Sequence, residues 1–231
     1  MGRFWEGFVT ETGSTTHIFF VKSRKLTAMT MTSLICTVEP SEQAVDNATI
    51  YRHLASIIED GQSAPDDASL ISVYLAAATS RLHGPNGLLG RALLDSTWEA
   101  KFDRWPAEVR IPLPRCMEVM KVEYVPYGAT DAVELASSAF LAYGLGTDTA
   151  RIRPAAGLAW PLLADHPAAV VVTFRAGWTQ DTLPATIKHA LLEMVTTAYA
   201  HRESVGYSTA SFGVLPYSAS QALRDWVVWT A

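Results

Sequence analysis

The residues with the clearest metal-ligand spacing are His189 and Glu193, in the segment HALLE. On a helix, residues four positions apart share one face, so the pair could offer two ligands to a metal ion. His201 is twelve residues beyond His189. At 1.5 Å per residue it would lie about 18 Å away, too far to complete such a site within one subunit. We therefore interpret the pair as an exposed surface pair and predict no metal site.

The common catalytic and nucleotide-binding patterns are missing. The sequence has no GxxxxGK(S/T), no GxGxxG after a strand, no GxSxG and no HExxH. The segment GPNGLLG at 84–90 follows a predicted helix and lacks the lysine, which favours a helix end and turn. The neighbouring carboxylates of Asp66 and Asp67 fit a helix start. We predict no catalytic residues and no cofactor, and an enzyme with an unrecognised site stays an alternative.

Three arginines could bind phosphate. Arg151 and Arg153 share one face of a predicted strand, and Arg175 ends another. The chain has a net charge of −5. Residues 1–30 have a net charge of +2, so the rest of the chain is more acidic than the total indicates. Proteins that bind nucleic acid without sequence preference usually carry a net positive charge. A small nucleic-acid-binding module is therefore an alternative function, and charged residues on the wet side of a sheet are the main interpretation.

Three stretches have the apolar spacing of amphipathic helices. We predict helices at 41–60, 66–83 and 184–203. An aspartate can cap the second, and a proline opens the third at a tolerated position. The expected buried stripe of the third helix consists of Ile187, Ala190, Leu191, Met194, Val195, Ala198 and Tyr199. Small residues on both stripes permit close approach, so the third helix is predicted to pack against the second.

Between these helices the apolar period changes to two. In TWEAKFDRWP, residues 97–106, apolar side chains alternate with charged ones. The apolar set is Trp98, Ala100 and Phe102, and the charged set is Glu99, Lys101 and Asp103. This alternation is typical of a strand with one apolar and one wet face. Similar runs separated by turns continue to residue 178. The sequence predicts an α+β fold: helices packed together, an inserted antiparallel β module at about 95–178, and an extended C-terminal tail.

The two ends differ from the middle. Residues 1–39 are predicted to be a leader, disordered or forming an arm, with ordered structure beginning near Pro40. Residues 207–231 have little regular periodicity but many large apolar side chains. These are Tyr207, Phe212, Leu215, Tyr217, Trp226 and Trp229. Exposed apolar groups usually mark a binding surface, so we predict that the tail is flexible alone and binds a partner. The alternative is a tail that folds back on the helices of its own subunit.

Composition sets the expected compartment. Hydrophobic residues make up 49% of the chain, and its two cysteines, Cys36 and Cys116, lie in no metal-type spacing. Two separated thiols favour a reducing compartment. No apolar run approaches the ~18 residues of a membrane helix, and the N-terminus does not have the pattern of a secretory signal. We expect an intracellular protein with no membrane partner.

The order of signals from Asp66 to Glu203 resembles a known family. It is similar to the head–tail connector, or adaptor, proteins of long-tailed phages and gene transfer agents. In chain order, the stretches that carry the resemblance are DDASLISVYLAAATSRL, GRALLDSTWEAKFDRWP, IPLP, ARIRPAAGLAWP, VVVTFRAGW and LPATIKHALLEMVTTAYAHRES. None is specific alone, but all six occur in the family's order and spacing.

The resemblance implies a structural subunit of a virion or phage-like particle, assembled in the host cytoplasm and located at the head–tail joint. A connector domain at 40–206 would form a homo-oligomeric ring, commonly of twelve, beneath the portal protein. The ring would extend the DNA channel without sequence-specific binding and would dock a tail-side stopper or tail terminator protein. Connectors of this kind reach the portal with their C-terminal segments, which assigns portal binding to 207–231.

A ring also needs contacts between its subunits. Rings are built from head-to-tail interfaces, whose two sides must be different and complementary. The mixed charges of the β module suit such an interface. The residues expected there are Glu99, Lys101, Asp103 and Arg104.

Overall fold

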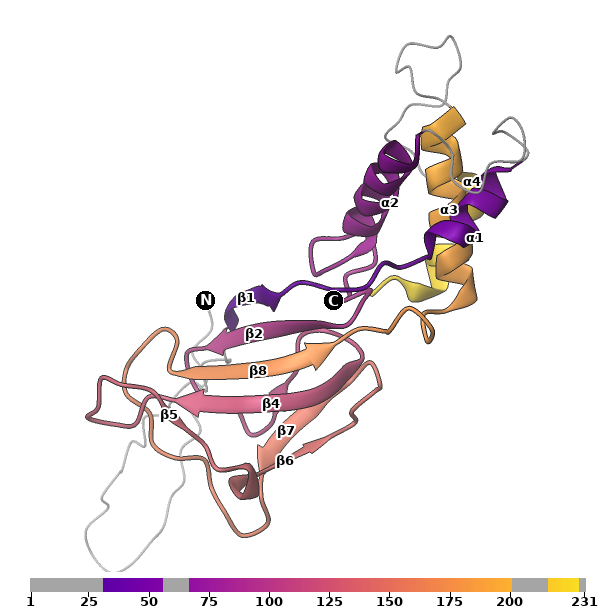
Figure 1. Cartoon of the computed structure of the whole chain (residues 1–231). Helices are drawn as coiled ribbons and strands as arrows, with labels where there is room; N and C mark the ends of the chain where they lie inside the picture. Colours follow the sequence, from indigo (N-terminus) through magenta and orange to yellow (C-terminus); the bar gives the residue numbers. More distant parts are fainter. Residues whose placement is uncertain (1–30, 56–66, 201–215, 229–231) are drawn as a thin grey trace, which may run out of the picture.

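The computed structural model describes residues 31–55, 67–200 and 216–228. Its helices are α1 (Asn47–Leu54), α2 (Ala68–Leu82), α3 (Ala185–Ala200) and α4 (Tyr217–Leu223), with 3-10 turns η1 (Ser137–Ala139) and η2 (Arg224–Trp226). Its strands are β1 (Met31–Val38), β2 (Ser96–Phe102), β3 (Val109–Arg110), β4 (Cys116–Tyr124), β5 (Val133–Glu134), β6 (Phe140–Tyr143), β7 (Arg151–Pro154) and β8 (Val170–Ala176). Figure 1 shows the helices at one end of the molecule and the sheets at the other. The predicted α+β class is confirmed.

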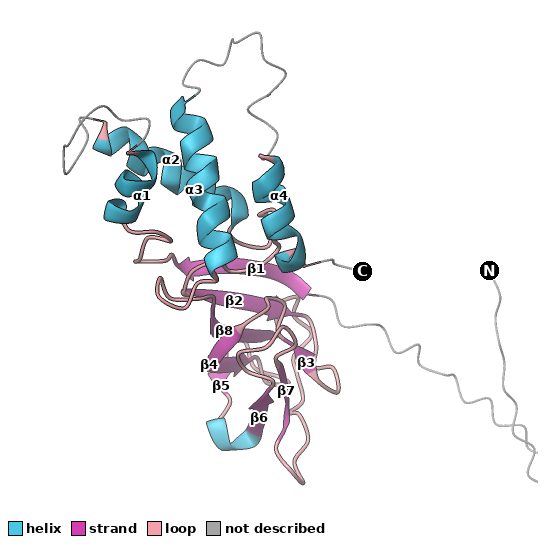
Figure 2. Ribbon diagram, turned by 90° about the vertical axis from the view of Figure 1, so that its right-hand side faces the viewer, coloured by secondary structure: helices cyan, strands magenta, loops and turns pink. Residues whose placement is uncertain are grey.

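The helical end is organised around α3. Helices α1 and α2 lie on one side of α3 and α4 on the other (Figure 2). Apolar side chains of all four helices form one buried cluster, including Ile50, Leu75, Leu191 and Leu223. The predicted packing of the third helix on the second is therefore confirmed. Its apolar stripe provides the contact surface, because one face of α3 is buried at Ile187, Ala190, Leu191 and Val195.

Helix α1 starts later than the predicted helix 41–60. The carboxylate of Asp46 accepts hydrogen bonds from the Thr49 backbone N–H at 2.8 Å and from the Thr49 hydroxyl at 2.7 Å. These bonds satisfy donors that the first helical turn leaves free, so the helix begins at Asn47. They also lower the pKa of Asp46. Residues 56–60 of the predicted helix lie outside the described residues.

The β module is two antiparallel sheets packed face to face. The larger sheet has the order β1-β2-β8-β4-β5, and the smaller has the order β3-β7-β6. Strand β2 alternates strictly, with Trp98, Ala100 and Phe102 buried and the residues between them only partly buried. The core between the sheets takes side chains from both, such as Phe174 of β8 and Ile152 of β7. Each sheet therefore has one outer face.

Ordered structure begins before Pro40, contrary to the predicted leader boundary. Strand β1 pairs antiparallel with β2 over Met31–Val38. Two of its threonines strengthen the pairing: the Thr32 hydroxyl donates to the Lys101 carbonyl, and the Thr37 hydroxyl to the Thr97 carbonyl. The alternation in β1 is broken by register shifts near both ends, which hides the strand in the sequence. Residues 1–30 lie outside the described part.

The C-terminal segment is helical over 217–226, where the sequence predicted an extended, flexible tail. Ala219 and Leu223 of α4 are fully buried against the other helices. A helix of seven residues shows less than two turns of periodicity, too little to recognise in sequence. Within the described ranges, no helix has both the length and the apolar character needed to cross a membrane.

The buried stripe of α3 generates the first prediction. Leu191 is 0% exposed, so Leu191→Asp would place an unpaired carboxylate in the helical core. It should lower the free energy of unfolding by about 4 kcal/mol or more. Ala185→Asp, at the exposed start of the same helix, should change it by less than about 0.5 kcal/mol. Urea unfolding of both variants measures the difference, and equal stabilities would contradict this packing.

Candidate functional site

The His189 and Glu193 pair joins two helices. The His189 Nδ1 lies 3.7 Å from the Glu193 carboxylate. The other oxygen of that carboxylate accepts a 2.7 Å hydrogen bond from the Ser218 hydroxyl of α4. Glu193 therefore ties α4 to α3. Among the described residues, no group of three or more His, Cys, Asp or Glu side chains is placed to hold a metal ion.

The three arginines proposed for phosphate do not form one site. Arg175 belongs to the larger sheet and contacts Asp95 at 3.3 Å and Glu118 at 3.8 Å. Arg151 and Arg153 belong to β7 of the smaller sheet, on the other side of the core. The three arginines therefore cannot act as one phosphate-binding stripe, the alternative considered from the sequence, because β8 and β7 belong to different sheets.

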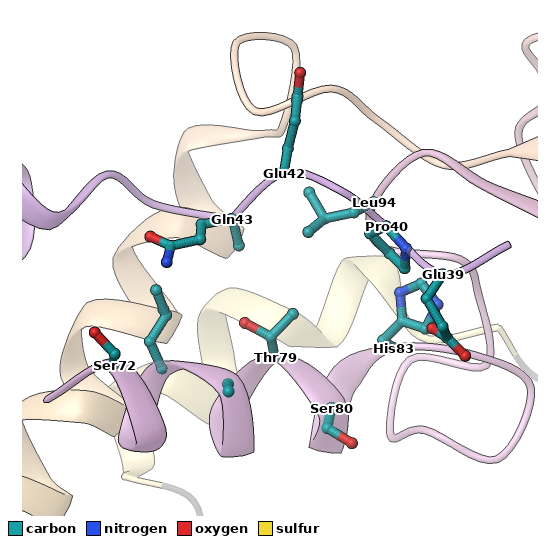
Figure 3. Close-up of a pocket in the computed structure, with 12 residues that line it drawn as sticks. Glu39, Pro40, Glu42, Gln43, Ser72, Thr79, Ser80, His83 and Leu94 are labelled. Carbon is teal, nitrogen blue, oxygen red and sulfur yellow. The ribbon is translucent and has the colours of Figure 1, made fainter. Parts of the chain in front are cut away.

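A cavity of about 340 Å³ lies between the 39–44 segment and α2 (Figure 3). Its polar groups include Glu39 and His83, while Glu42 points away from it. The His83 Nδ1 accepts a hydrogen bond from the Leu93 backbone N–H, and burial lowers the pKa of His83. The imidazole is therefore neutral, and the Leu93 bond occupies the nitrogen that could act as a base. We interpret the cavity as a packing groove rather than a reaction centre.

The larger sheet leaves one face uncovered by any element in the described part of the chain (Figure 1). We call it the open face. The strand register places its side chains in three rows, each running across β1, β2, β8 and β4 in that order. The first row is Ser33, Lys101, Val171 and Glu123, and the second is Ile35, Glu99, Thr173 and Lys121. The third row is Val38, Thr97, Arg175 and Glu118. Charged side chains line β2 and β4, while β8 between them is mostly uncharged. Val171 and Thr173 of β8 therefore lie between charged side chains of β2 and β4.

Two of the predicted interface residues lie on this open face. Glu99 and Lys101 are neighbours on β2, with their charged atoms 3.9 Å apart, and both are about one-third exposed. Asp103 and Arg104 follow the end of the strand, where the Arg104 guanidinium lies 2.9 Å from the Asp103 carboxylate. On β4, Lys121 and Glu123 form a further pair at 2.7 Å. The structure thus brings the predicted residues onto one edge of a larger charged surface. Whether they contact another subunit stays a prediction.

The predicted portal-binding residues divide into three groups. Tyr217 is 79% exposed. Trp226 is half-buried in its own subunit, where its indole N–H donates to the Thr186 hydroxyl at 3.0 Å. The remaining residues lie outside the described ones: Tyr207, Phe212, Leu215 and Trp229. The tail aromatics therefore do not act as one free set, because Trp226 closes the helical core.

The junction between helices and sheets is built around Trp178, directly after β8. Trp178 is 5% exposed. The guanidinium carbons of Arg91 and Arg115 lie 5.6 and 5.1 Å from its ring centroid, and the Trp226 ring meets it edge-on. Arg91 also donates to the Trp226 carbonyl at 2.8 Å. A cavity of about 400 Å³ lies beside these residues. Such cation–π and edge-to-face ring contacts hold the helical end and the β module together.

Several proteins of known three-dimensional structure share this architecture. A chain in the neck of an empty GTA particle, computed with C6 symmetry, superposes with a TM-score of 0.65 and 19% identity, covering 86% of this chain and 97% of that one. A chain in the virion of a native gene transfer agent (GTA) particle gives 0.63 and 17%, covering 86% and 96%. This chain shares the fold of those GTA particle proteins.

A third GTA structure supports the same fold. A chain in the neck of a native GTA particle, computed with C12 symmetry, gives a TM-score of 0.52 at 14% identity, covering 84% of this chain and 97% of that one. No protein-family model and no curated protein matches the sequence. The likeness to the GTA chains is therefore one of three-dimensional structure.

The sequence reasoning did not find the Trp178 junction. Its members come from four separate places: the loop before β2, the turn before β4, the end of β8 and the C-terminal turn. No periodicity links them, because the contacts are made only in three dimensions.

The half-buried Trp226 gives the second prediction. Trp226→Ala removes the ring contact with Trp178 and the bond to Thr186, so it should lower the free energy of unfolding by about 2 kcal/mol and the Tm by about 5 °C. Tyr217→Ala, on the exposed side of α4, should change stability by less than about 0.5 kcal/mol. Thermal unfolding followed by circular dichroism compares the two. Equal losses would mean that Trp226 does not hold the junction.

The buried His83 predicts a dependence of stability on pH. The pKa of folded His83 lies below its ordinary value of 6.5 because of burial. At pH values between the two pKa values, the unfolded chain binds more protons, so stability falls as the pH drops from 7 to 5. His83→Gln should flatten this slope, whereas His53→Gln on the exposed side of α1 should leave it unchanged. Urea midpoints at pH 7, 6 and 5 provide the measurement, and parallel slopes for all three proteins would contradict it.

Proposed function

We propose that this chain is a structural subunit of a particle neck, where it acts as a head–tail connector. The observation that supports this is the fold shared with the neck chain of an empty GTA particle, which covers 86% of this chain and 97% of that one. Coverage that is nearly complete in both directions means that the helical end, the β module and their order are all shared. A single common module would not produce such a match.

In this proposal the subunits form a closed ring in a virion or phage-like particle, at the joint between head and tail. The two neck structures with this fold were computed with C6 and C12 symmetry. A ring of twelve subunits satisfies both symmetries, which supports the number that the family resemblance implies. DNA would pass through the ring without sequence-specific binding, in keeping with the net charge of −5.

The ring has two partners in this proposal, the portal protein on the head side and a stopper or tail terminator protein on the tail side. Of the portal-binding residues predicted from the sequence, Tyr217 is a large side chain displayed to solvent. We assign portal binding to Tyr217 together with Tyr207, Phe212, Leu215 and Trp229, which lie outside the described residues. Trp226 is left out of this set, since its ring serves the Trp178 junction.

A catalytic role has less support. The side chains considered for chemistry make structural contacts: Glu193, singled out in the sequence, joins α3 to α4, and His83 beside the cavity accepts a hydrogen bond from the Leu93 backbone. We therefore propose that the chain is a structural protein. An enzyme is the alternative function, and the assembly experiment described next distinguishes the two.

The proposal predicts a defined assembly failure. In cells that make the particle, deleting the gene for this chain should leave DNA-filled heads and separate tails, because the docking surface for the tail is lost. Cryo-electron microscopy of intact particles should show the chain at the neck. Normal tailed particles from the deletion strain would contradict the proposal.

The same strain tests the portal contact. Complementation with Tyr217→Ala should reduce attachment of the protein to heads by about tenfold or more, since tyrosine is a common interface anchor. Tyr127→Ala removes an equally exposed tyrosine from the β module and is the matched control. If both variants attach like the natural protein, Tyr217 is not a portal contact.

A further inference from the structure

The two outer faces of the β module carry opposite net charge. The open face of the larger sheet is acidic, and its charged residues are Asp95, Glu99, Glu118, Glu123 and Glu134 against Lys101, Lys121 and Arg175. Five carboxylates against three cations leave an excess of two negative charges. The excess lies toward β4 and β5, where Glu123 and Glu134 are directly paired across the strands.

The outer face of the smaller sheet is basic. Arg110 of β3 pairs across with Arg151 of β7, and Arg151 with Tyr143 of β6. Arg153 lies on the same face, two residues along β7, because Ile152 between them points into the core and is 1% exposed. All three arginines are exposed. We call this surface the basic face.

One carboxylate reduces the charge of the basic face. The Arg151 guanidinium lies 3.0 Å from the Glu108 carboxylate. Arg153 lies over the Tyr143 ring, 5.6 Å from its centroid. Arg110 has no ion-pair partner among the residues that the structure describes. Three arginines against one glutamate leave an excess of two positive charges, equal and opposite to the excess on the open face.

Both faces also carry uncharged side chains next to their charges. On the open face, Val171 and Thr173 of β8 separate the charged side chains of β2 and β4. On the basic face, Leu141 of the edge strand β6 is 46% exposed and pairs across with Arg153 of the central strand β7. Protein–protein interfaces usually combine uncharged and charged side chains in one patch.

The two faces point in opposite directions, because the core of the β module lies between the sheets. We propose that the open face of one subunit docks on the basic face of the next copy, so that repetition of this contact closes the ring. This inference rests on the proposed function as a ring-forming connector. A head-to-tail ring requires two different, complementary surfaces on each subunit, and these two faces meet that requirement.

Duplex DNA is the other polyanion that could bind the basic face. A second copy is favoured because the complementary surface is present on the same molecule, with an excess charge of equal size and opposite sign. The charge of Arg151 is also already balanced by Glu108. DNA binding is therefore kept as an outcome of the test.

Charge reversal tests the contact. Arg151→Glu with Arg153→Glu would set two acidic faces against each other, and Glu118→Lys with Glu123→Lys would set two basic faces against each other. Each double variant should weaken self-association by about tenfold or more, as like charges repel across an interface. A chain with all four changes should associate again, because the two faces are complementary with reversed sign. Sedimentation at a series of protein concentrations, and incorporation into the necks of complemented particles, are the two readouts.

Arg52→Glu with Arg224→Glu is the matched control, since it changes the net charge equally but on the exposed surface of α1 and after α4. It should associate normally. Circular dichroism of every variant separates misfolding from lost contact. Recovery by the fourfold variant supports the inference.

Three outcomes would overturn the inference. The first is normal incorporation of the Arg151→Glu with Arg153→Glu variant. The second is a fourfold variant that remains folded but does not associate again. The third is a loss of duplex DNA affinity in the arginine variant while its assembly is unchanged. The last would assign the basic face to DNA. Absence of the natural chain from the neck would instead refute the proposed function, so the two failures are distinguishable.

Discussion

The close approach of Gly177 to the backbone of Leu94 is the constraint on which the rest of the structure depends. Gly177 has φ of +118°, and a Cβ there would collide with the Leu94 carbonyl oxygen. Without a side chain, the chain leaving β8 can run beside 93–95, where Trp178 donates to the Leu93 carbonyl and accepts from Asp95 N–H. This places the Trp178 ring between the two arginines and against Trp226. The sheets and the helices therefore share one rigid joint rather than a flexible linker.

Local patterns were sufficient to predict most elements of the fold. Helices α2 and α3 carry long apolar stripes, and β2 alternates without interruption, so each is visible within a short window of sequence. Strand β1 and helix α4 are different. The pairing of β1 joins residues 59 to 71 positions apart, and α4 is seven residues long. Both owe their structure to surfaces made elsewhere in the chain, which a local reading does not contain.

The candidate interface shows the same limit. The sequence could identify Glu99 and Lys101 as charged neighbours on a wet strand face. It could not show that Glu118 and Glu123 join them, because register shifts in β4 change which side chains share the face. Nor could it separate Arg175 from Arg151, since that depends on which sheet each strand enters. Charge on a sheet acquires meaning only when the register and the order of strands are known.

The use of C-terminal residues to complete the joint has a consequence for biosynthesis. Arg91 is bonded to the carbonyl of Trp226, and Leu89 accepts a hydrogen bond from the backbone of Val228. A ribosome makes residues 89 and 91 long before residues 226 and 228. The loop with Leu89 and Arg91 therefore makes these hydrogen bonds only after residues 226 and 228 have left the ribosome. The helical end cannot be completed on a shorter nascent chain. Incomplete chains released early would lack the joint and would leave the apolar surfaces around Trp178 uncovered.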